Sequence, residues 1–209
     1  MKPLLAAILI ALAAPHAHAA VAVTNLSLPN NTDSWDLEPA QTIAISFTVG
    51  NTAPQWSFES VDLLIHNATG AAFPIIVELH ADSSGNVGTA LLQMNSADAP
   101  NGTTTVNFTS PALLLLNAGT TYWLTAASTD TTARVGWVYA EPNDGSQTGE
   151  PGWSILDHVS TNFNDGNGWQ LFPNDNPTLF TLNATAVPEP TAALLGLSLL
   201  GLLVPRRRK

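Results

Sequence analysis

The sequence predicts an all-β protein, an antiparallel β-sandwich or jelly roll, with a signal-peptide helix before it and a short transmembrane helix after it. Three observations support this fold class. Apolar and polar residues alternate with a period of two along much of the interior of the 209-residue chain. Turn segments rich in Gly, Asn, Asp and Pro separate the alternating runs. Between the terminal segments, no long stretch has the periodicity of an amphipathic helix.

The N-terminus, residues 1–19, has the organisation of a secretory signal peptide. Lys2 precedes the apolar run LLAAILIALAA, and the small residues Ala17 and Ala19 then mark a cleavage site for signal peptidase after Ala19. An N-terminal membrane anchor is the alternative, but the apolar run is short and an A-x-A site follows it. We therefore expect an exported body that begins at Ala20 and is long enough for one domain with its own core.

The body, residues 20–186, contains a series of runs that predict half-buried strands. In the run IAISFTV, Ile43, Ile45 and Phe47 share one face, while Ala44 and Ser46 share the other. Such alternation is typical of antiparallel strands with one buried face. The predicted strands are IAISFTV (43–49), FESVDLLIH (58–66), PIIVELH (74–80), TTTVNF (103–108), TYWLTAA (121–127), RVGWVYA (134–140), WQLF (169–172) and TLFTLNA (178–184).

The alternation fails between residues 141 and 168, where Gly, Asn and Asp are frequent and apolar residues are few. This composition predicts two long polar loops, 141–152 and 157–168, around a short strand or turn near residues 153–156. Long loops on a rigid β scaffold are where binding residues usually lie.

Charge and cysteine content exclude several classes of function. Over residues 20–190, sixteen acidic residues accompany one basic residue, Arg134, so the net charge is near −15. Such a surface repels nucleic acid, and it repels anionic lipids or polysaccharides unless a divalent cation bridges them. The chain has no cysteine, which excludes disulfides, thiolate metal sites and cysteine nucleophiles.

The C-terminus, residues 187–209, combines three features in order. Val187, Pro188, Glu189 and Pro190 form a proline-flanked segment that cannot continue a helix. The apolar segment 191–204 would be about 21 Å long as a helix, which is short for a bilayer core of about 30 Å. The basic stop consists of Arg206, Arg207, Arg208 and Lys209. In an exported chain this order predicts a temporary stop in the inner membrane, with the basic residues held on the cytoplasmic side.

This order resembles the PEP-CTERM sorting signal of Gram-negative bacteria, with Val187 to Pro190 as the motif, 191–204 as the transmembrane helix and 206–209 as the basic tail. The resemblance implies processing near the motif by an exosortase, a membrane-embedded cysteine protease or transpeptidase. It also implies a setting of exopolysaccharide and biofilm matrix. The alternative is an ordinary single-pass anchor, and the shortness of the apolar segment counts against it.

The body is similar, over about residues 41–139, to the extracellular domain called choice-of-anchor R. The similarity rests on four segments in one order, QTIAISFTVG, SVDLLIHNATG, IIVELHADSSGNVGTALL and LNAGTTYWLTAAS. Val87 stands where the family often has proline. The resemblance implies a surface domain found with different sorting signals, and it carries over no catalytic residue.

Catalytic chemistry has little support in the residue pattern. His66, His80 and His158 are not at ligand spacing, and there is no HExxH or GxSxG motif. His80 lies two residues before Asp82. Such a His–Asp pair could form at most half of a catalytic or metal site. Paired carboxylates would suit a glycoside hydrolase, and the candidates are Glu59, Asp62, Glu78 and Asp82.

Calcium has somewhat more support than catalysis, because hard cations take several oxygen ligands from flexible loops. Such oxygens are offered by Asn143, Asp144 and Glu150 in the first polar loop and by Asn162, Asn164 and Asp165 in the second. The alternative is that these Asn-Asp-Gly segments are ordinary turns. No other cofactor is expected.

The tryptophans divide by their expected position. Trp137 shares a face with Val135 and Tyr139 and is expected to be buried, whereas Trp123 is out of phase with Leu124 and faces the other side of its strand. Trp153 and Trp169 border the polar loops, so they are the candidates for exposed residues that stack on a glycan. Packing beneath the loops is the alternative for both.

These observations predict a non-enzymatic protein, exported through the inner membrane, transiently membrane-anchored, and then a structural component of the cell surface or extracellular matrix. Its expected partners are signal peptidase and an exosortase during export, then an exopolysaccharide. The alternatives are a carbohydrate-binding module for a neutral glycan and, with less support, a hydrolase. Exposed tryptophans would favour the binding module, and two close carboxylates in a cleft would favour the hydrolase.

Overall fold

The computed structural model describes residues 19–68, 71–129, 135–141, 146–163, 166–173 and 175–188, and these residues form strands and loops with no helix. The expected signal-peptide and transmembrane helices lie outside the described residues. Within the described ranges, no helix is long and apolar enough to cross a membrane.

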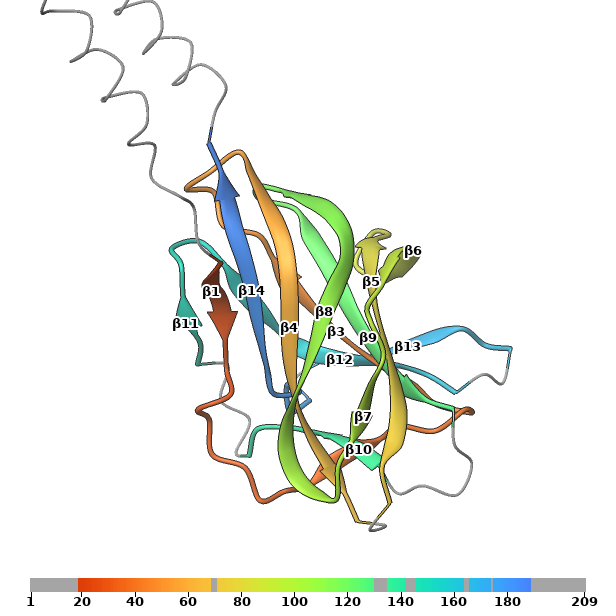
Figure 1. Ribbon diagram of the computed structural model, residues 1–209. Helices are drawn as coiled ribbons and strands as arrows, with labels where there is room; N and C mark the ends of the chain where they lie inside the picture. The colour runs from red at the N-terminus through yellow and green to blue at the C-terminus, as the bar shows by residue number, and fades with distance from the viewer. Residues whose placement is uncertain are drawn as a thin grey trace, which may run out of the picture.

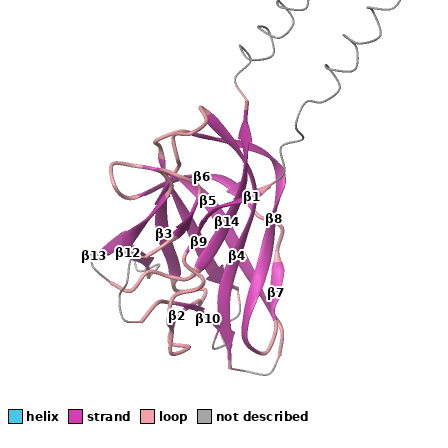
Figure 2. Cartoon of the chain, turned by 90° about the vertical axis from the view of Figure 1, so that its left-hand side faces the viewer, coloured by secondary structure: helices cyan, strands magenta, loops and turns pink. Residues whose placement is uncertain are grey.

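The strands form two antiparallel sheets of seven strands each, which lie as two layers (Figures 1 and 2). In the first sheet the order is β11-β1-β14-β4-β10-β2, and β8 pairs with β4. In the second sheet the order is β13-β12-β3-β9-β5-β6, and β7 pairs with β5. The first sheet contains β1 (Ala20–Thr24), β2 (Ser34–Asp36), β4 (Gln55–Asn67), β8 (Gly102–Asn117), β10 (Val135–Val138), β11 (Thr148–Gly149) and β14 (Phe180–Val187). The second contains β3 (Thr42–Thr48), β5 (Phe73–Asp82), β6 (Val87–Gln93), β7 (Ala97–Ala99), β9 (Thr121–Ser128), β12 (Ser154–Asn162) and β13 (Trp169–Pro173).

The hydrophobic core lies between the sheets and is built by the predicted alternation. Ile43 and Ile45 of β3 and Val61, Leu63 and Ile65 of β4 are all fully buried and belong to one cluster. Burying each such side chain contributes about 1.5–3 kcal/mol relative to leaving it in water. The period of two therefore fixes which face of each strand meets the other sheet.

Every predicted run overlaps an observed strand, but the predicted loop over residues 157–168 is wrong in its first half. Residues 154–162 form β12, which pairs with β3 on one side and β13 on the other. The alternation was not visible because the buried positions of this strand include Ser160 and Thr161, which are polar but fully enclosed. Hydroxyl side chains suit a pleated surface and can be buried when the neighbouring strands cover them.

The two ends of the described body lie at the same end of the first sheet. β1 and β14 are antiparallel neighbours, and Ala20 pairs with Ala184, three residues before the end of β14. Val187 pairs with Gln55, which in turn pairs with Asn117 at the end of β8. We call this end, defined by Ala20, Gln55, Asn117 and Val187, the terminal pole (Figure 1).

Candidate functional site

The expected sorting motif begins where the last strand ends. Val187 is the final residue of β14, and Pro188 follows it in an exposed position. Glu189, Pro190, the apolar segment 191–204 and the basic residues 206–209 lie outside the described residues. Ala19, the expected cleavage residue of the signal peptide, is exposed immediately before β1, and Ala17 lies outside the described residues. Both expected processing sites thus adjoin the terminal pole.

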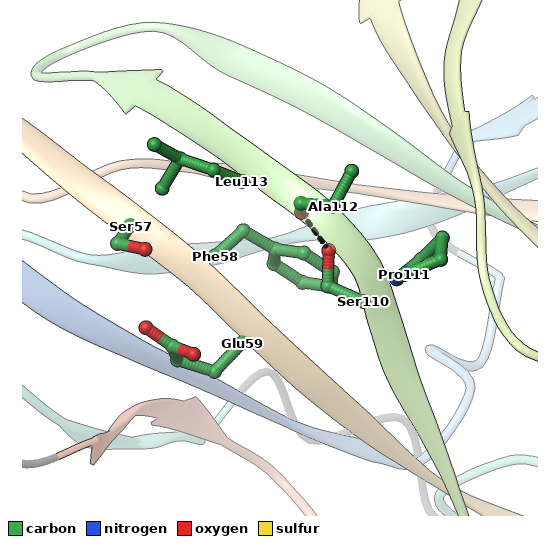
Figure 3. Close-up of a pocket in the computed structure, with 7 residues that line it drawn as sticks. All are labelled: Ser57, Phe58, Glu59, Ser110, Pro111, Ala112 and Leu113. Carbon is green, nitrogen blue, oxygen red and sulfur yellow. Dashed lines mark hydrogen bonds between the residues drawn. The ribbon is translucent and has the colours of Figure 1, made fainter.

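A cleft opens between β4 and β8 at a break in the first sheet. On β4, Phe58 pairs with Leu114 of β8, and Ser60 pairs with Thr109. One residue of β4 therefore faces the four residues 110–113 of β8, so the two strands separate here. The cleft has a volume of about 360 Å³, which lies at the small end of the range for ligand sites. Its lining is Ser57, Phe58, Glu59, Ser110, Pro111, Ala112 and Leu113 (Figure 3).

Glu59 is itself a bulge residue on its other side. Phe58 pairs with Ala184 of β14 and Ser60 pairs with Asn183, so Glu59 is an extra residue relative to β14. A bulge bends a strand and redirects the side chain of the extra residue. Two irregularities therefore coincide at Glu59, one toward each neighbouring strand, and together they open the sheet at this point.

The expected exposure of Trp153 is wrong. Only 5% of Trp153 is accessible, and its ring lies 6.1 Å from that of Phe47 and 5.3 Å from that of Trp56. Gly50 permits this position, because a Cβ on that residue would lie 2.4 Å from the Trp153 ring. The residue borders a polar loop, but its side chain turns inward and closes the core near the terminal pole.

Trp169 is partly buried on the outer face of the second sheet, where it packs against Ala44, Val87 and Trp123. Trp123 lies on this outer face, as its phase in the strand predicted, and it is nevertheless 1% exposed. Trp137 is fully buried, which confirms the prediction for that residue. Trp153 and Trp169 therefore do not form a row of exposed tryptophans.

The His80 side chain is held in a hydrogen-bonded network on the same outer face. Its Nδ1 lies 2.9 Å from the carbonyl oxygen of Gly88, which can only accept, so Nδ1 carries a proton. Its Nε2 lies 3.3 Å from both Thr125 Oγ1 and Glu78 Oε2.

Asp82 completes this network beside His80. The indole nitrogen of Trp123 donates to Asp82 Oδ1 at 2.9 Å, and the Gly85 amide donates to Asp82 Oδ2 at 3.0 Å. The polar groups of His80 and Asp82 therefore already have partners within the protein. This network accounts for the residues that the sequence offered as half of a catalytic site.

The candidate carboxylates for glycoside hydrolysis belong to different sheets. Glu59 and Asp62 lie on β4 of the first sheet, and Glu78 and Asp82 lie on β5 of the second. Asp62 accepts hydrogen bonds from the Asn107 amide at 2.7 Å and from the Asn183 amide at 3.1 Å. Of these four carboxylates, only Glu59 lines the cleft.

The other expected sites are placed only in part. Four of the candidate calcium ligands, Asn143, Asp144, Asn164 and Asp165, lie outside the described residues. Of the other two, Glu150 follows β11 and Asn162 is the last residue of β12. Among the residues with described side chains, no group of three or more His, Asp or Glu is arranged to hold a metal ion. His66 lies at the outer face of β4, where its Nδ1 is 2.8 Å from Thr103 Oγ1.

Sequence reasoning missed most of the cleft. Its β8 side, the segment SPALL, was not assigned to any strand, and Leu113 was not singled out. The signal was present in Pro111, because proline within an apolar run marks an edge strand or a bulge. Leu113, which is 75% exposed, is the most exposed large apolar side chain among the described residues.

No protein-family model matches this chain, and no curated protein is similar to it in sequence.

Proposed function

We propose that this chain is an exported, non-enzymatic protein of the cell surface or extracellular matrix, built as a β-sandwich and delivered by its two terminal segments. The observation that carries this proposal is the position of the two ends of the folded body. Ala20 and Val187 both lie at the terminal pole because β1 and β14 are antiparallel neighbours. Both expected membrane-directed segments therefore leave the body from one end.

Delivery then takes place in two steps. Signal peptidase removes residues 1–19, and the short apolar segment 191–204 holds the exported body at the inner membrane. The basic residues 206–209 remain on the cytoplasmic side. An exosortase then cuts near residues 188–190 and releases the body to the surface or matrix, where an exopolysaccharide is its partner.

The position of Val187 and Pro188 supports processing close to the folded body. Pro188 follows the last residue of β14 without an intervening linker and is exposed. The processing enzyme therefore works at the terminal pole itself. Residues 51 and 52, in the exposed loop between β3 and β4, and Asn117 are the surface it meets beside the motif.

The strand order supports a jelly roll. With the short strands and the β12–β13 hairpin set aside, the sheets contain β1-β14-β4-β8 and β3-β9-β5-β6. Most connections between consecutive strands of this set cross from one sheet to the other, as in eight-stranded jelly rolls.

A carbohydrate-binding module is the second candidate, and the cleft between β4 and β8 is the observation that favours it. Trp153 no longer supports this role because it is buried. The cleft instead offers a carboxylate, hydroxyls and exposed apolar walls at the solvent surface.

Substitution of Glu189 in the native host tests the delivery proposal. We expect Glu189→Ala protein to be exported and to keep residues 206–209 in the membrane fraction, while wild-type protein loses them. Glu38→Ala removes an exposed carboxylate from the body and should be processed like the wild type. Fractionation and immunoblotting with tags on either side of the motif measure both outcomes. Normal processing of Glu189→Ala, or a wild-type protein found unexported, would contradict the proposal.

A further inference from the structure

The cleft between β4 and β8 contains a carboxylate to which no described residue is hydrogen-bonded. Among the described residues, no hydrogen bond or ion pair engages the Glu59 side chain, in contrast to Asp62 three residues later. Ser57 lies on the same strand and on the same side of the cleft (Figure 3). Phe58 closes the floor, since only 1% of it is exposed, so a ligand would rest on the cleft without entering the core.

The opposite wall is apolar and open to solvent. Pro111, Ala112 and Leu113 of β8 are all exposed and line the cleft, and Figure 3 shows Leu113 between β8 and β4. Leu115, two residues farther along β8, is also exposed. The cleft therefore combines an apolar wall with an anionic and hydroxyl-bearing wall, which suits a ligand that is apolar on one side and cationic or polar on the other.

Electrostatics exclude an anionic ligand and favour a cationic one. None of the described residues is a lysine or an arginine, and the body has a net charge near −15. A phosphate, sulfate or uronate would meet no positive side chain in the cleft and would be repelled by Glu59. A protonated amine would form a charge-assisted hydrogen bond with Glu59, which is stronger than a bond between neutral groups.

The backbone of β8 is unsuited to an extended peptide at this position. Peptides that add to a sheet edge bind through backbone hydrogen bonds. Here Pro111 has no N–H, and the Ser110 hydroxyl already donates to the Ala112 carbonyl at 2.5 Å. Proline and a bulge are the usual devices that prevent edge pairing. The cleft therefore suits a compact, ring-shaped ligand better than an extended peptide.

We infer that this cleft binds amino-sugar residues of a glycan, with the sugar ammonium on Glu59, a hydroxyl near Ser57 and the apolar C–H face of the ring against Leu113. This inference rests on the proposed function, because a glycan is the polymer that a matrix protein meets. It assigns the ligand class as a glycan with free amino groups, in place of the neutral glycan that the sequence suggested.

The experiment is a calorimetric titration of the full-length chain, purified in a mild non-ionic detergent. The probes are a β-1,4-linked glucosamine hexamer and the N-acetylated hexamer of the same length, at a mildly acidic pH that keeps the free amines protonated. We expect the amino hexamer to bind with a Kd of about 0.1–1 mM, and the acetylated hexamer to bind at least about ten-fold more weakly.

Two variants locate the binding. Glu59→Gln should weaken binding of the amino hexamer about three- to ten-fold, because it removes the charge and keeps the shape. Glu38→Gln removes the same charge from an exposed position elsewhere, so it should change the Kd by less than about two-fold. Leu113→Ser should weaken both hexamers by a similar factor. A thermal melt of each variant checks that it is folded.

Each contrary result overturns the inference. Absence of binding would show that the cleft does not take this ligand. Equal weakening by Glu59→Gln and Glu38→Gln would show that binding comes from the general negative charge of the body. Equal binding of the acetylated hexamer would remove the role of the amine. Equal or tighter binding of hexalysine, lost in Glu59→Gln, would assign the cleft to basic peptides instead. Because the unprocessed chain is used, this test is independent of the delivery proposal. Binding can fail while delivery and processing occur as proposed, and binding can be found while delivery and processing fail.

Discussion

The outer face of the second sheet and the cleft of the first sheet both carry carboxylates, but only one set is already engaged. Around His80, Glu78 and Asp82 contact an imidazole, an indole and a backbone amide. In the cleft, the Glu59 side chain makes no hydrogen bond or ion pair with the described residues and stands beside a break in the strand pairing. Engaged polar groups stabilise the fold, whereas a free carboxylate at a bulge remains available to a ligand. The comparison therefore separates a hydrogen-bonded cluster from the cleft that we propose as a binding site.

The largest expected effect is on the structural side. Trp123→Ala should lower the free energy of unfolding by about 3–5 kcal/mol, because a nearly fully buried indole is lost and Asp82 loses a donor. Denaturant unfolding followed by circular dichroism measures this change. A loss below about 1 kcal/mol would show that the outer-face cluster is not packed as described.

A smaller effect is expected at His80. His80→Ala should cost about 1–3 kcal/mol, because the Gly88 carbonyl and the Thr125 hydroxyl lose their partner. His66→Ala is the matched control, since His66 has a single exposed hydrogen bond to Thr103 and should cost less than about 0.5 kcal/mol. Equal losses in the two variants would contradict the distinction between these histidines.

A third group of carboxylates, around Tyr139, is expected to make the stability of the fold depend on pH. Partial burial raises the pKa of Tyr139 above its ordinary value of 10.0, and the nearby charges of Asp33, Glu141 and Asp175 raise it further. Above about pH 10 the unfolded chain loses the tyrosine proton while the folded chain keeps it, so stability falls as the pH rises through the folded pKa. Tyr139→Phe should remove this contribution and leave the stability near neutral pH almost unchanged. Alkaline unfolding curves that coincide for the two proteins would contradict the described surroundings of Tyr139.

The smallest effect on stability is expected in the cleft. Glu59→Gln and Leu113→Ser should each change the free energy of unfolding by less than about 0.5 kcal/mol, because Glu59 bonds to none of the described residues and Leu113 is largely exposed. Thermal melts of these variants beside His80→Ala sharpen the comparison. A substantial loss in Glu59→Gln would make the cleft carboxylate structural and reverse the assignment.

The alternation of side chains was sufficient to predict the central strands. β3, β4, β5, β9 and β14 all follow runs in which every second residue is apolar. It was not sufficient for β12, where Ser160 and Thr161 occupy buried positions between two neighbouring strands. Burial there depends on which strands pair, and a single sequence does not contain that information.

The candidate site was less predictable than the fold. Trp153 borders a polar loop, yet the close approach of Gly50 lets its ring pack on Phe47 and Trp56. Position along the chain does not determine the direction of a side chain at the end of a loop. The cleft forms because, between two consecutive paired positions, β4 has one residue and β8 has four. This difference depends on the register in which the two strands pair. Pro111 was the only residue in the sequence that indicated this break in the strand pairing.

The most direct test of the central claim, delivery and processing from one pole, is the intact mass of the protein purified from its native host. The account predicts a single mature species that begins at Ala20 and ends within residues 188–190, or that carries an added mass at that new C-terminus. A mature species that begins at Met1, or one that still contains residues 206–209 at steady state, would contradict the account.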